Sequence, residues 1–398
     1  MNQTLALPEE SIMSSADKPA TKNQTKSSLK FNVDRDVLEE ALSVIVSSLN
    51  SLPTLPILGH VLVQSHENRL VITGSDLTLS VEANISAEIL SDGITTVPGK
   101  SILNYIKTLP KGNINFEQSA KNVRVISGRS RLDLPQFNPE DYPKVSFVPV
   151  SMSVPASVLS LAIKQTRKSI GTDTTRPILN GIHFIIDGNK ITAASSDCRR
   201  LHVSDHTIQS SNQKNEKSEI VVPSEAIDPL LKILSVSGQK EIGSNVFIGL
   251  NQSSFTVQYG AYLFHTRSVD GQYPDYEKII PKSFQNIALV DKDQLMSAIK
   301  RARLADNKTS KIVLSVSNNE LRLHSAGDNT IESEDVLDVT YSGEPLQMGV
   351  NSSFLLDTLE SVSGKTVRFK LNQPADPISV TESDSNTFNA IIMPIRLN

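Results

Sequence analysis

The sequence predicts an α+β protein built from three similar domains of about 120 residues each. Two landmarks recur along the 398 residues and support this fold class. The first is a hairpin of alternating residues with a polar turn, whose copies lie at 53–77, 175–201 and, more weakly, 310–328. The second is a strand that runs into a helix, whose copies lie at 95–109, 219–234 and 346–362.

The spacing of the copies sets the domain limits. Ile57 and Ile178 are 121 residues apart, and so are Asp76 and Asp197. Each unit also opens with a strand and a helix and closes with alternating strands. We therefore place three domains at 29–149, 150–284 and 285–398. The Ser-, Thr-, Asn- and Lys-rich composition of residues 1–28 predicts a disordered extension outside the fold.

Small residues precede the helix of the second landmark. Ser101, Ser224 and Ser352 stand where an N-cap oxygen would accept hydrogen bonds from free helix amides. We expect these serines to cap the three helices.

Composition excludes several classes of protein. The net charge of −4 argues against a surface that binds phosphates everywhere, although local basic faces remain compatible with it. The absence of Trp disfavours stacking platforms for single-stranded nucleic acid. A single cysteine, Cys198, allows no intrachain disulfide and fits a reducing cytoplasm. We see no apolar run long enough to span a bilayer and no secretory signal.

Three of the expected helices carry basic residues opposite their apolar stripes. An ordinary solvated helix face explains any one of them, but three at equivalent points of a repeat favour contact with the DNA backbone. Such contact is independent of base sequence. The candidate DNA-binding residues are Lys100, Lys107, Lys111, Lys164, Arg167, Lys168, Lys300 and Arg301.

Motifs for catalysis and for metal or cofactor binding are not found. The string SGKT at 363–366 follows a helix and has Leu359 where a phosphate loop needs glycine. Cys198, His202 and His206 would suit zinc on a helix, but their segment alternates like a strand. We therefore expect a buried thiol and two surface histidines, and no metal, cofactor or catalytic residue.

Several segments resemble the beta subunit of bacterial DNA polymerase III. They are DVLEEAL, PTLPILGHVLV, TGSDL, TTVPGKS, SGRSRLDL, TRPILNGI, SSDCRRL, VDGQYPDYEKIIP, DVTYSG and the terminal MPIRL. Each string is weak alone, but together they run in order from about residue 30 to the end.

The resemblance implies a sliding clamp, a non-catalytic ring around double-stranded DNA. A head-to-tail homodimer would place helices on the inner face and antiparallel sheets on the outer face. It would tether the replicative polymerase catalytic subunit in the cytoplasm and also bind the clamp loader and other proteins with a clamp-binding motif. The matching dimer residues are Leu132, Leu134 and Leu304. Arg303 replaces a residue that is usually apolar, so we expect an acidic partner for it.

The resemblance also implies one pocket for partner peptides between the second and third domains. An aliphatic floor with arginines at the rim suits a peptide with spaced apolar anchors. The matching residues are Arg176, Leu179, Ser196, Arg200, Leu201, Pro274, Lys278, Ile279, Asn351, Phe354, Met393, Pro394, Ile395, Arg396 and Leu397. Core packing is the alternative for Leu179, Leu201 and Ile279.

Two other functions remain open from the residues alone. One is a repeat-built scaffold that binds only proteins and does not encircle DNA. The other is an enzyme whose site has no familiar motif. Basic helices that share one face would favour the DNA-binding function over the scaffold.

Overall fold

A computed structural model describes residues 28–50, 52–208, 217–236, 245–305, 310–326 and 331–397. The extension expected at the N-terminus therefore lies outside the described residues, apart from Ser28. None of the helices in the described ranges combines the length and the apolar character that crossing a membrane requires.

Each of the three repeats contains two helices and a set of antiparallel strands. The first has β1 Lys30–Asp34, α1 Arg35–Val46, β2 His60–His66, β3 Arg69–Ser75, β4 Leu79–Ser86, β5 Glu88–Ser91, β6 Ile94–Pro98, α2 Gly99–Thr108, β7 Asn113–Gln118, β8 Asn122–Ser127 and β9 Ser130–Pro135. The second has β10 Met152–Pro155, α3 Ala156–Thr166, β11 Gly181–Asp187, β12 Lys190–Ser196, β13 Arg200–Thr207, β14 Ser218–Pro223, α4 Ser224–Leu234, β15 Asn245–Leu250, β16 Ser254–Tyr259 and β17 Tyr262–Arg267.

The third repeat follows the same order. It has β18 Asn286–Asp291, α5 Lys292–Ala305, β19 Lys311–Ser317, β20 Glu320–Ala326, β21 Glu332–Asp338, β22 Thr340–Ser342, β23 Leu346–Asn351, α6 Ser352–Ser361, β24 Thr366–Leu371, β25 Ile378–Glu382 and β26 Phe388–Ile392. Short 3₁₀ turns lie at η1 Pro56–Gly59, η2 Pro139–Asp141, η3 Arg167–Ser169, η4 Pro177–Leu179 and η6 Tyr276–Ile279.

The expected serine caps are wrong. The N-cap positions of α2 and α4 are Pro98 and Pro223, neither of which makes a side-chain cap bond, and Asn351 caps α6. Ser224 is instead the first helical residue, and its amide donates to the carbonyl of Asn180 at 3.0 Å. That bond fastens the helix start to the preceding hairpin, so the helix needs no serine side chain there.

The sheets run across the repeat boundaries. β4 of the first repeat pairs antiparallel with β17 of the second, within an eight-stranded sheet ordered β10-β15-β16-β17-β4-β3-β2-β6. β13 of the second pairs antiparallel with β26 of the third, within a nine-stranded sheet ordered β14-β11-β12-β13-β26-β25-β24-β18-β22. Two smaller sheets, β5-β1-β7-β8-β9 and β21-β20-β19-β23, lie at the ends of the series.

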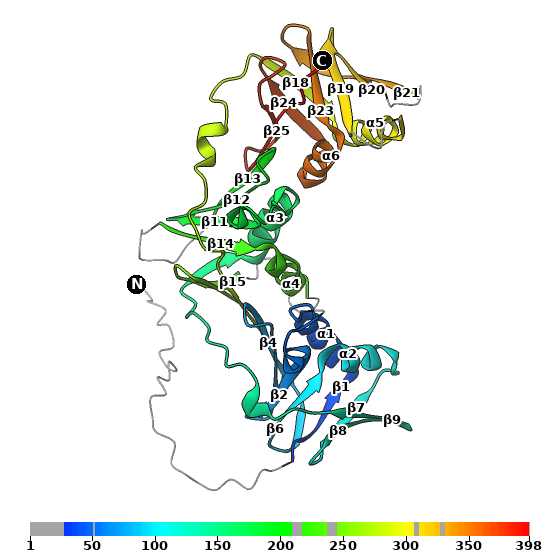
Figure 1. Cartoon of the computed structure of the whole chain (residues 1–398), viewed down its shortest axis with the longest axis vertical. Coiled ribbons are helices and arrows are strands. Elements are labelled where there is room, and N and C mark those ends of the chain that lie inside the picture. Colours follow the sequence, from blue (N-terminus) through cyan, green and yellow to red (C-terminus); the bar gives the residue numbers. More distant parts are fainter. Residues whose placement is uncertain are drawn as a thin grey trace, which may run out of the picture.

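The helices form a continuous row. Within the repeats α1 contacts α2, α3 contacts α4, and α5 contacts α6. Across the boundaries α1 contacts α4 and α3 contacts α6, so the order in space is α2-α1-α4-α3-α6-α5. Figure 1 shows these helices following one another along one side of the elongated molecule. The apolar side of the row packs on the sheets, as the stripes Leu38, Ala41, Leu42 and Ile45 of α1 illustrate.

Candidate functional site

The boundary between β13 and β26 brings the C-terminal segment beside the second repeat. Arg200 lies opposite Ile392 in the strand pair, and the amide of Met393 donates to the carbonyl of Arg199 at 2.9 Å. The amide of Ile395 then donates to Gly349 of β23 at 2.8 Å. A Cβ at Gly349 would lie 2.5 Å from the carbonyl oxygen of Ile395, so only glycine permits this close approach.

A small apolar cluster lies at the same boundary. It is separate from the two large cores and contains Leu179, Ala194, Leu201, Val203, Val221, Tyr273, Tyr276 and Ile391. Leu179 and Leu201 are two of the aliphatic residues that the resemblance placed in a peptide pocket. Tyr273 and Tyr276 come from the segment that connects the second and third repeats. Sequence reasoning missed these tyrosines, because their three-residue spacing in QYPDY carries no strand alternation.

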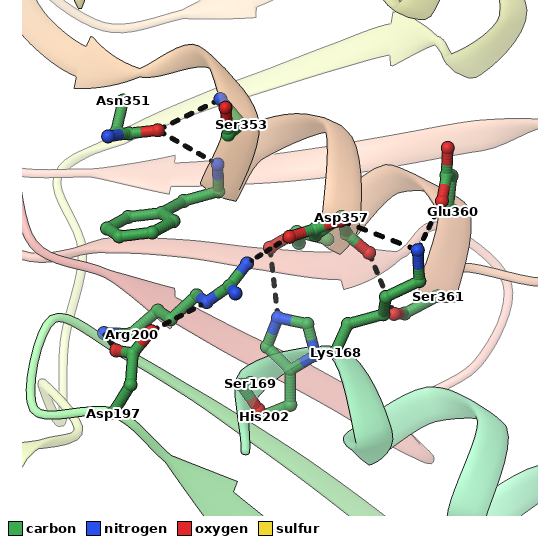
Figure 2. A network of polar contacts seen from close by, with 12 residues as sticks. Lys168, Ser169, Asp197, Arg200, His202, Asn351, Ser353, Asp357, Glu360 and Ser361 are labelled. Carbon is green, nitrogen blue, oxygen red and sulfur yellow. Dashed lines mark hydrogen bonds and ion pairs between the residues drawn. The ribbon is translucent and has the colours of Figure 1, made fainter. Parts of the chain in front are cut away.

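Arg200 occupies the centre of the boundary. Its Nε donates to Oδ2 of Asp197 at 3.0 Å and its Nη1 to Oδ2 of Asp357 at 2.6 Å. The guanidinium carbon also lies 4.5 Å from the centroid of the Phe354 ring, close enough for a cation–π contact. Figure 2 shows Arg200 reaching from β13 between Asp197 and Asp357 of α6. We call Leu179, Leu201, Phe354, Met393 and Leu397, together with Arg200, the junction surface.

The junction surface combines buried and exposed apolar groups. Leu201 is fully buried and Phe354 is half-buried, whereas Met393 is 44% exposed and Leu397 is 37% exposed. Exposed side chains of this size beside a buried apolar floor are typical of a surface that binds a partner. The guanidinium groups of Arg176, Arg199 and Arg396 are exposed near the same strands.

A polar network beneath the junction surface joins α3 and α6. Nζ of Lys168 lies 2.9 Å from Oε2 of Glu360 and 3.5 Å from Oδ1 of Asp357 (Figure 2). The hydrogen bond to Glu360 raises the pKa of Lys168. His202 is fully buried, with Nδ1 2.9 Å from the carbonyl of Gln165 and Nε2 3.0 Å from the hydroxyl of Thr358. Burial lowers the pKa of His202 to about 4, so the ring is neutral near pH 7.

Other residues expected in the pocket have structural partners. Asn351 accepts hydrogen bonds from the amides of Ser353 and Phe354 at 2.9 and 3.1 Å, so its side chain caps α6. The hydroxyl of Ser196 donates to the carbonyl of Arg200 at 2.8 Å and closes the turn before β13.

The predicted pocket residues of the connecting segment lie on its exposed side, unlike the buried Tyr273 and Tyr276. Pro274, Lys278 and Ile279 are all exposed, and Nζ of Lys278 lies 2.9 Å from Oδ2 of Asp275. The remaining positions, Pro394, Ile395 and Arg396, belong to the C-terminal segment that lies along β23.

The expected burial of Cys198 and exposure of His202 and His206 are both wrong. Cys198 is exposed, because it lies in the turn between β12 and β13 with φ 69° rather than in a strand. His202 and His206 are buried, because β13 is paired on both sides and covered by α3. Within the described ranges, no three His, Cys, Asp or Glu residues come together as a metal site.

The basic residues lie on or beside three helices of the row. Four of the eight form ion pairs: Lys111 with Asp36 at 3.1 Å, Arg167 with Asp228 at 2.8 Å, Lys168 with Glu360, and Arg301 with Asp335 at 2.5 Å. Ion pairs at exposed positions contribute only about 0–1 kcal/mol each. Lys107, Lys164 and Lys300 form no ion pair with the described part of the chain.

Two strands leave unpaired edges at opposite ends of the series. β9 ends the five-stranded sheet and β21 ends the four-stranded sheet, and Figure 1 shows them at the lower and upper right. Of the expected dimer residues, Leu304 is 74% exposed and Leu132 is half-buried, while Leu134 is buried in its own core. Val336 on β21 is 48% exposed, and sequence reasoning missed it because the ESEDVLD segment looks like an ordinary polar strand.

The fold and these surfaces together define a clamp-type protein: three tandem α+β repeats, sheets that continue from repeat to repeat, and one row of helices. Three domain models identify the particular family within this class. The N-terminal, central and C-terminal domain models of the DNA polymerase III beta subunit match residues 29–146, 153–275 and 277–396.

Curated relatives and solved structures agree with the family models. The beta sliding clamp of Escherichia coli K12 is 30% identical over 374 residues, which cover 93% of this chain and all of the relative. That of Proteus mirabilis is 29% identical with the same coverage. A crystal structure of the sliding clamp from Pseudomonas aeruginosa bound to griselimycin has a TM-score of 0.87 at 29% identity, covering 93% of this chain and all of that one.

The chain therefore belongs to the DNA polymerase III beta subunit family, the bacterial beta sliding clamps. Its function is that of a processivity clamp in DNA replication, and it is a non-catalytic subunit rather than an enzyme. A scaffold that binds only proteins is not favoured.

Proposed function

We propose that two copies of the chain close head to tail into a ring around double-stranded DNA in the cytoplasm. The supporting observation is an equivalence among strands. In each repeat the last strand of the first half is β4, β13 or β21, and the last strand of the second half is β9, β17 or β26. β4 pairs with β17 and β13 with β26, which leaves only β21 and β9 without an equivalent partner.

Pairing β21 of one copy with β9 of another would complete this series of strand pairs between repeats. It would join a four-stranded and a five-stranded sheet, and it would bring α5 beside α2 as α1 lies beside α4. The edges also differ in charge, because β21 carries four acids (Glu332, Glu334, Asp335 and Asp338) while the β9 edge carries Arg129 and Arg131 beside one acid, Asp133. A head-to-tail contact of this kind closes when the rotation permits, and two copies supply both joints.

A ring closed in this way would direct the helix row toward its opening. Lys107, Lys164 and Lys300, from α2, α3 and α5, would then face the DNA backbone from all three repeats. Contact with phosphates alone carries no base preference and so permits sliding.

The assembly is tested by the mass of the protein in solution. Light scattering behind gel filtration is expected to give about twice 43.4 kDa at micromolar concentration. Val336→Lys places a positive charge on the exposed β21 edge, opposite the arginines of the β9 edge, and is expected to yield a folded monomer. Val37→Lys is the matched control, since Val37 is similarly exposed, at 42%, on α1. A wild-type monomer, or a Val336→Lys dimer, would contradict the proposed pairing.

We also assign the docking of the polymerase catalytic subunit, the clamp loader and other partners to the junction surface. Its apolar floor and arginine rim suit a short peptide with apolar anchors. Met393→Ala with Leu397→Ala removes the two most exposed anchors and should weaken binding of the purified polymerase catalytic subunit roughly tenfold. The dimer mass should not change. Unaltered polymerase affinity would remove this assignment.

A further inference from the structure

The two boundaries between repeats share one backbone arrangement. β4 pairs antiparallel with β17 at the first boundary, as β13 pairs with β26 at the second. At the end of the first pair, the amide of Arg267 donates to the carbonyl of Thr78 at 2.9 Å. At the end of the second, the amide of Met393 donates to the carbonyl of Arg199, also at 2.9 Å. The buried residues of the two boundaries can therefore be compared position by position.

These buried residues differ in polarity between the two boundaries. The first boundary buries apolar side chains: Val44 of α1, Val81, Ala83 and Ile85 of β4, Leu230 of α4 and Tyr259 at the end of β16. The second buries polar side chains at the equivalent positions: Gln165 of α3, His202, Ser204 and His206 of β13, Thr358 of α6 and Glu382 at the end of β25. We call this second set the polar layer.

The apolar cores follow the same difference. One apolar cluster extends through the first and second repeats, from Leu29 to Phe264, and includes all the apolar residues of the first boundary. The third repeat has a large cluster of its own. Among the described residues, the cluster that crosses the second boundary is the small one that contains Leu201 and Ile391. The first two repeats therefore share one core, and the third does not.

Hydrogen bonds take the place of apolar packing in the polar layer. Nε2 of Gln165 donates to Oε1 of Glu382 at 3.2 Å, and Nε2 of His202 lies 3.0 Å from the hydroxyl of Thr358. Both contacts join the second repeat to the third. Within the second repeat, the hydroxyl of Ser204 donates to Oε1 of Gln165 at 2.6 Å.

We propose that the polar layer makes the second boundary the joint at which this chain bends, and that the third repeat unfolds there as a separate unit. Separating an apolar boundary exposes apolar surface to water, at a cost proportional to the area exposed. Separating the polar layer exchanges its hydrogen bonds for hydrogen bonds to water, so each bond lost costs little. In the closed position, the same directional bonds fix how the two repeats sit together.

A joint at this boundary has a consequence for the proposed ring. Bending there would move the third repeat, with its β21 edge, away from β9 of the other copy, while the first two repeats move as one body. Opening would then use two joints, one in each copy. This consequence rests on the proposed ring, whereas the separate unfolding of the third repeat does not.

Hydrogen exchange of the full chain, followed by mass spectrometry, tests the joint. Leu42→Ala leaves a cavity in the shared core and should speed exchange about a hundredfold in the first and second repeats, but not in the third. Leu359→Ala, in the core of the third repeat, should speed exchange there alone. Both variants are measured in the Val336→Lys chain, which removes coupling through a ring. Faster exchange in all three repeats from either substitution would overturn the inference.

Apolar replacement of one contact connects the effect to the polar layer. His202→Val with Thr358→Leu copies the residues of the first boundary and should spread the effect of Leu42→Ala into the third repeat. Thr266→Val is the matched control, because it replaces a buried polar residue at the first boundary, where the core is already apolar. It should leave the third repeat unaffected. No spread in the His202→Val, Thr358→Leu chain would mean that the polar layer does not separate the repeats.

The lifetime of the clamp on nicked circular DNA tests the role of the joint in opening. His202→Val with Thr358→Leu should lengthen that lifetime about threefold, and Thr266→Val should not. An unchanged lifetime would reject bending at the second boundary, even where the third repeat unfolds separately. Equal retention on circular and cut DNA would instead reject the ring itself.

Discussion

At the scale of single residues, the boundary between the second and third repeats depends on a few side chains with several contacts each. Arg200 contacts Asp197, Asp357 and Phe354, so one guanidinium links a turn, a helix and an aromatic ring. Sequence comparison assigns Arg200 and Phe354 to a pocket but cannot show that they touch one another. That contact depends on the pairing of β13 with β26, which joins residues nearly 200 positions apart.

His202 makes the boundary sensitive to acid. Its folded pKa of about 4 lies below the ordinary value of 6.5, so the unfolded chain binds more protons between these pH values. Stability is therefore retained above pH 6.5 and is lost as the pH falls toward 4, by an amount on the order of a few kcal/mol. Urea unfolding at a series of pH values should show a shallower loss for His202→Gln than for wild type. Equal slopes would mean that His202 is not the group responsible.

At the scale of elements, the sequence predicts the order of strands and helices better than their ends. The repeat of hairpins and strand–helix units appears in the structure because alternation and helical periodicity are local signals. The prediction of serine caps is wrong because the backbone amides of Ser224 and Ser352 donate instead to the carbonyls of Asn180 and Ser310. Partners so distant in sequence leave no local signal.

The alternating pattern also predicted that Cys198 lies in a strand, whereas it lies in the turn before β13. A turn residue with positive φ interrupts the alternation, and the segment SSDCRRL gives no glycine to mark it. The same limit applies to Tyr273 and Tyr276, whose burial depends on docking against His183 and Val221 rather than on periodicity.

The capping of α6 gives a prediction at this scale. Asn351→Ala removes the acceptor for two helix amides and should lower the free energy of unfolding by about 1 kcal/mol. Because Phe354 is in the first turn of α6, polymerase affinity should also fall. Ser353→Ala, which removes only a hydroxyl in the same turn, is the control for both measurements. Equal effects of the two substitutions would argue against capping by Asn351.

At the scale of the whole molecule, the net charge of −4 conceals an uneven distribution. Lys107, Lys164 and Lys300, which form no ion pair with any residue that the structure describes, lie on three helices of the row, although several neighbouring cations are paired with carboxylates. Lys107→Glu, Lys164→Glu and Lys300→Glu together should shorten the lifetime of the loaded clamp on DNA, most strongly at raised salt. Lys121, Lys144 and Lys282, exposed outside the helices, form the matched control for the same change in charge. A similar loss in both triple variants would indicate a general charge effect.

We propose that the chain holds DNA by surrounding it, and the topology of the DNA tests this most directly. Protein loaded onto nicked circular DNA should remain bound through gel filtration at a salt concentration that abolishes ordinary electrostatic contact. Cutting the circle once with a restriction enzyme should release it, because a ring slides off a free end. Equal retention on the circle and on the cut DNA would contradict encirclement.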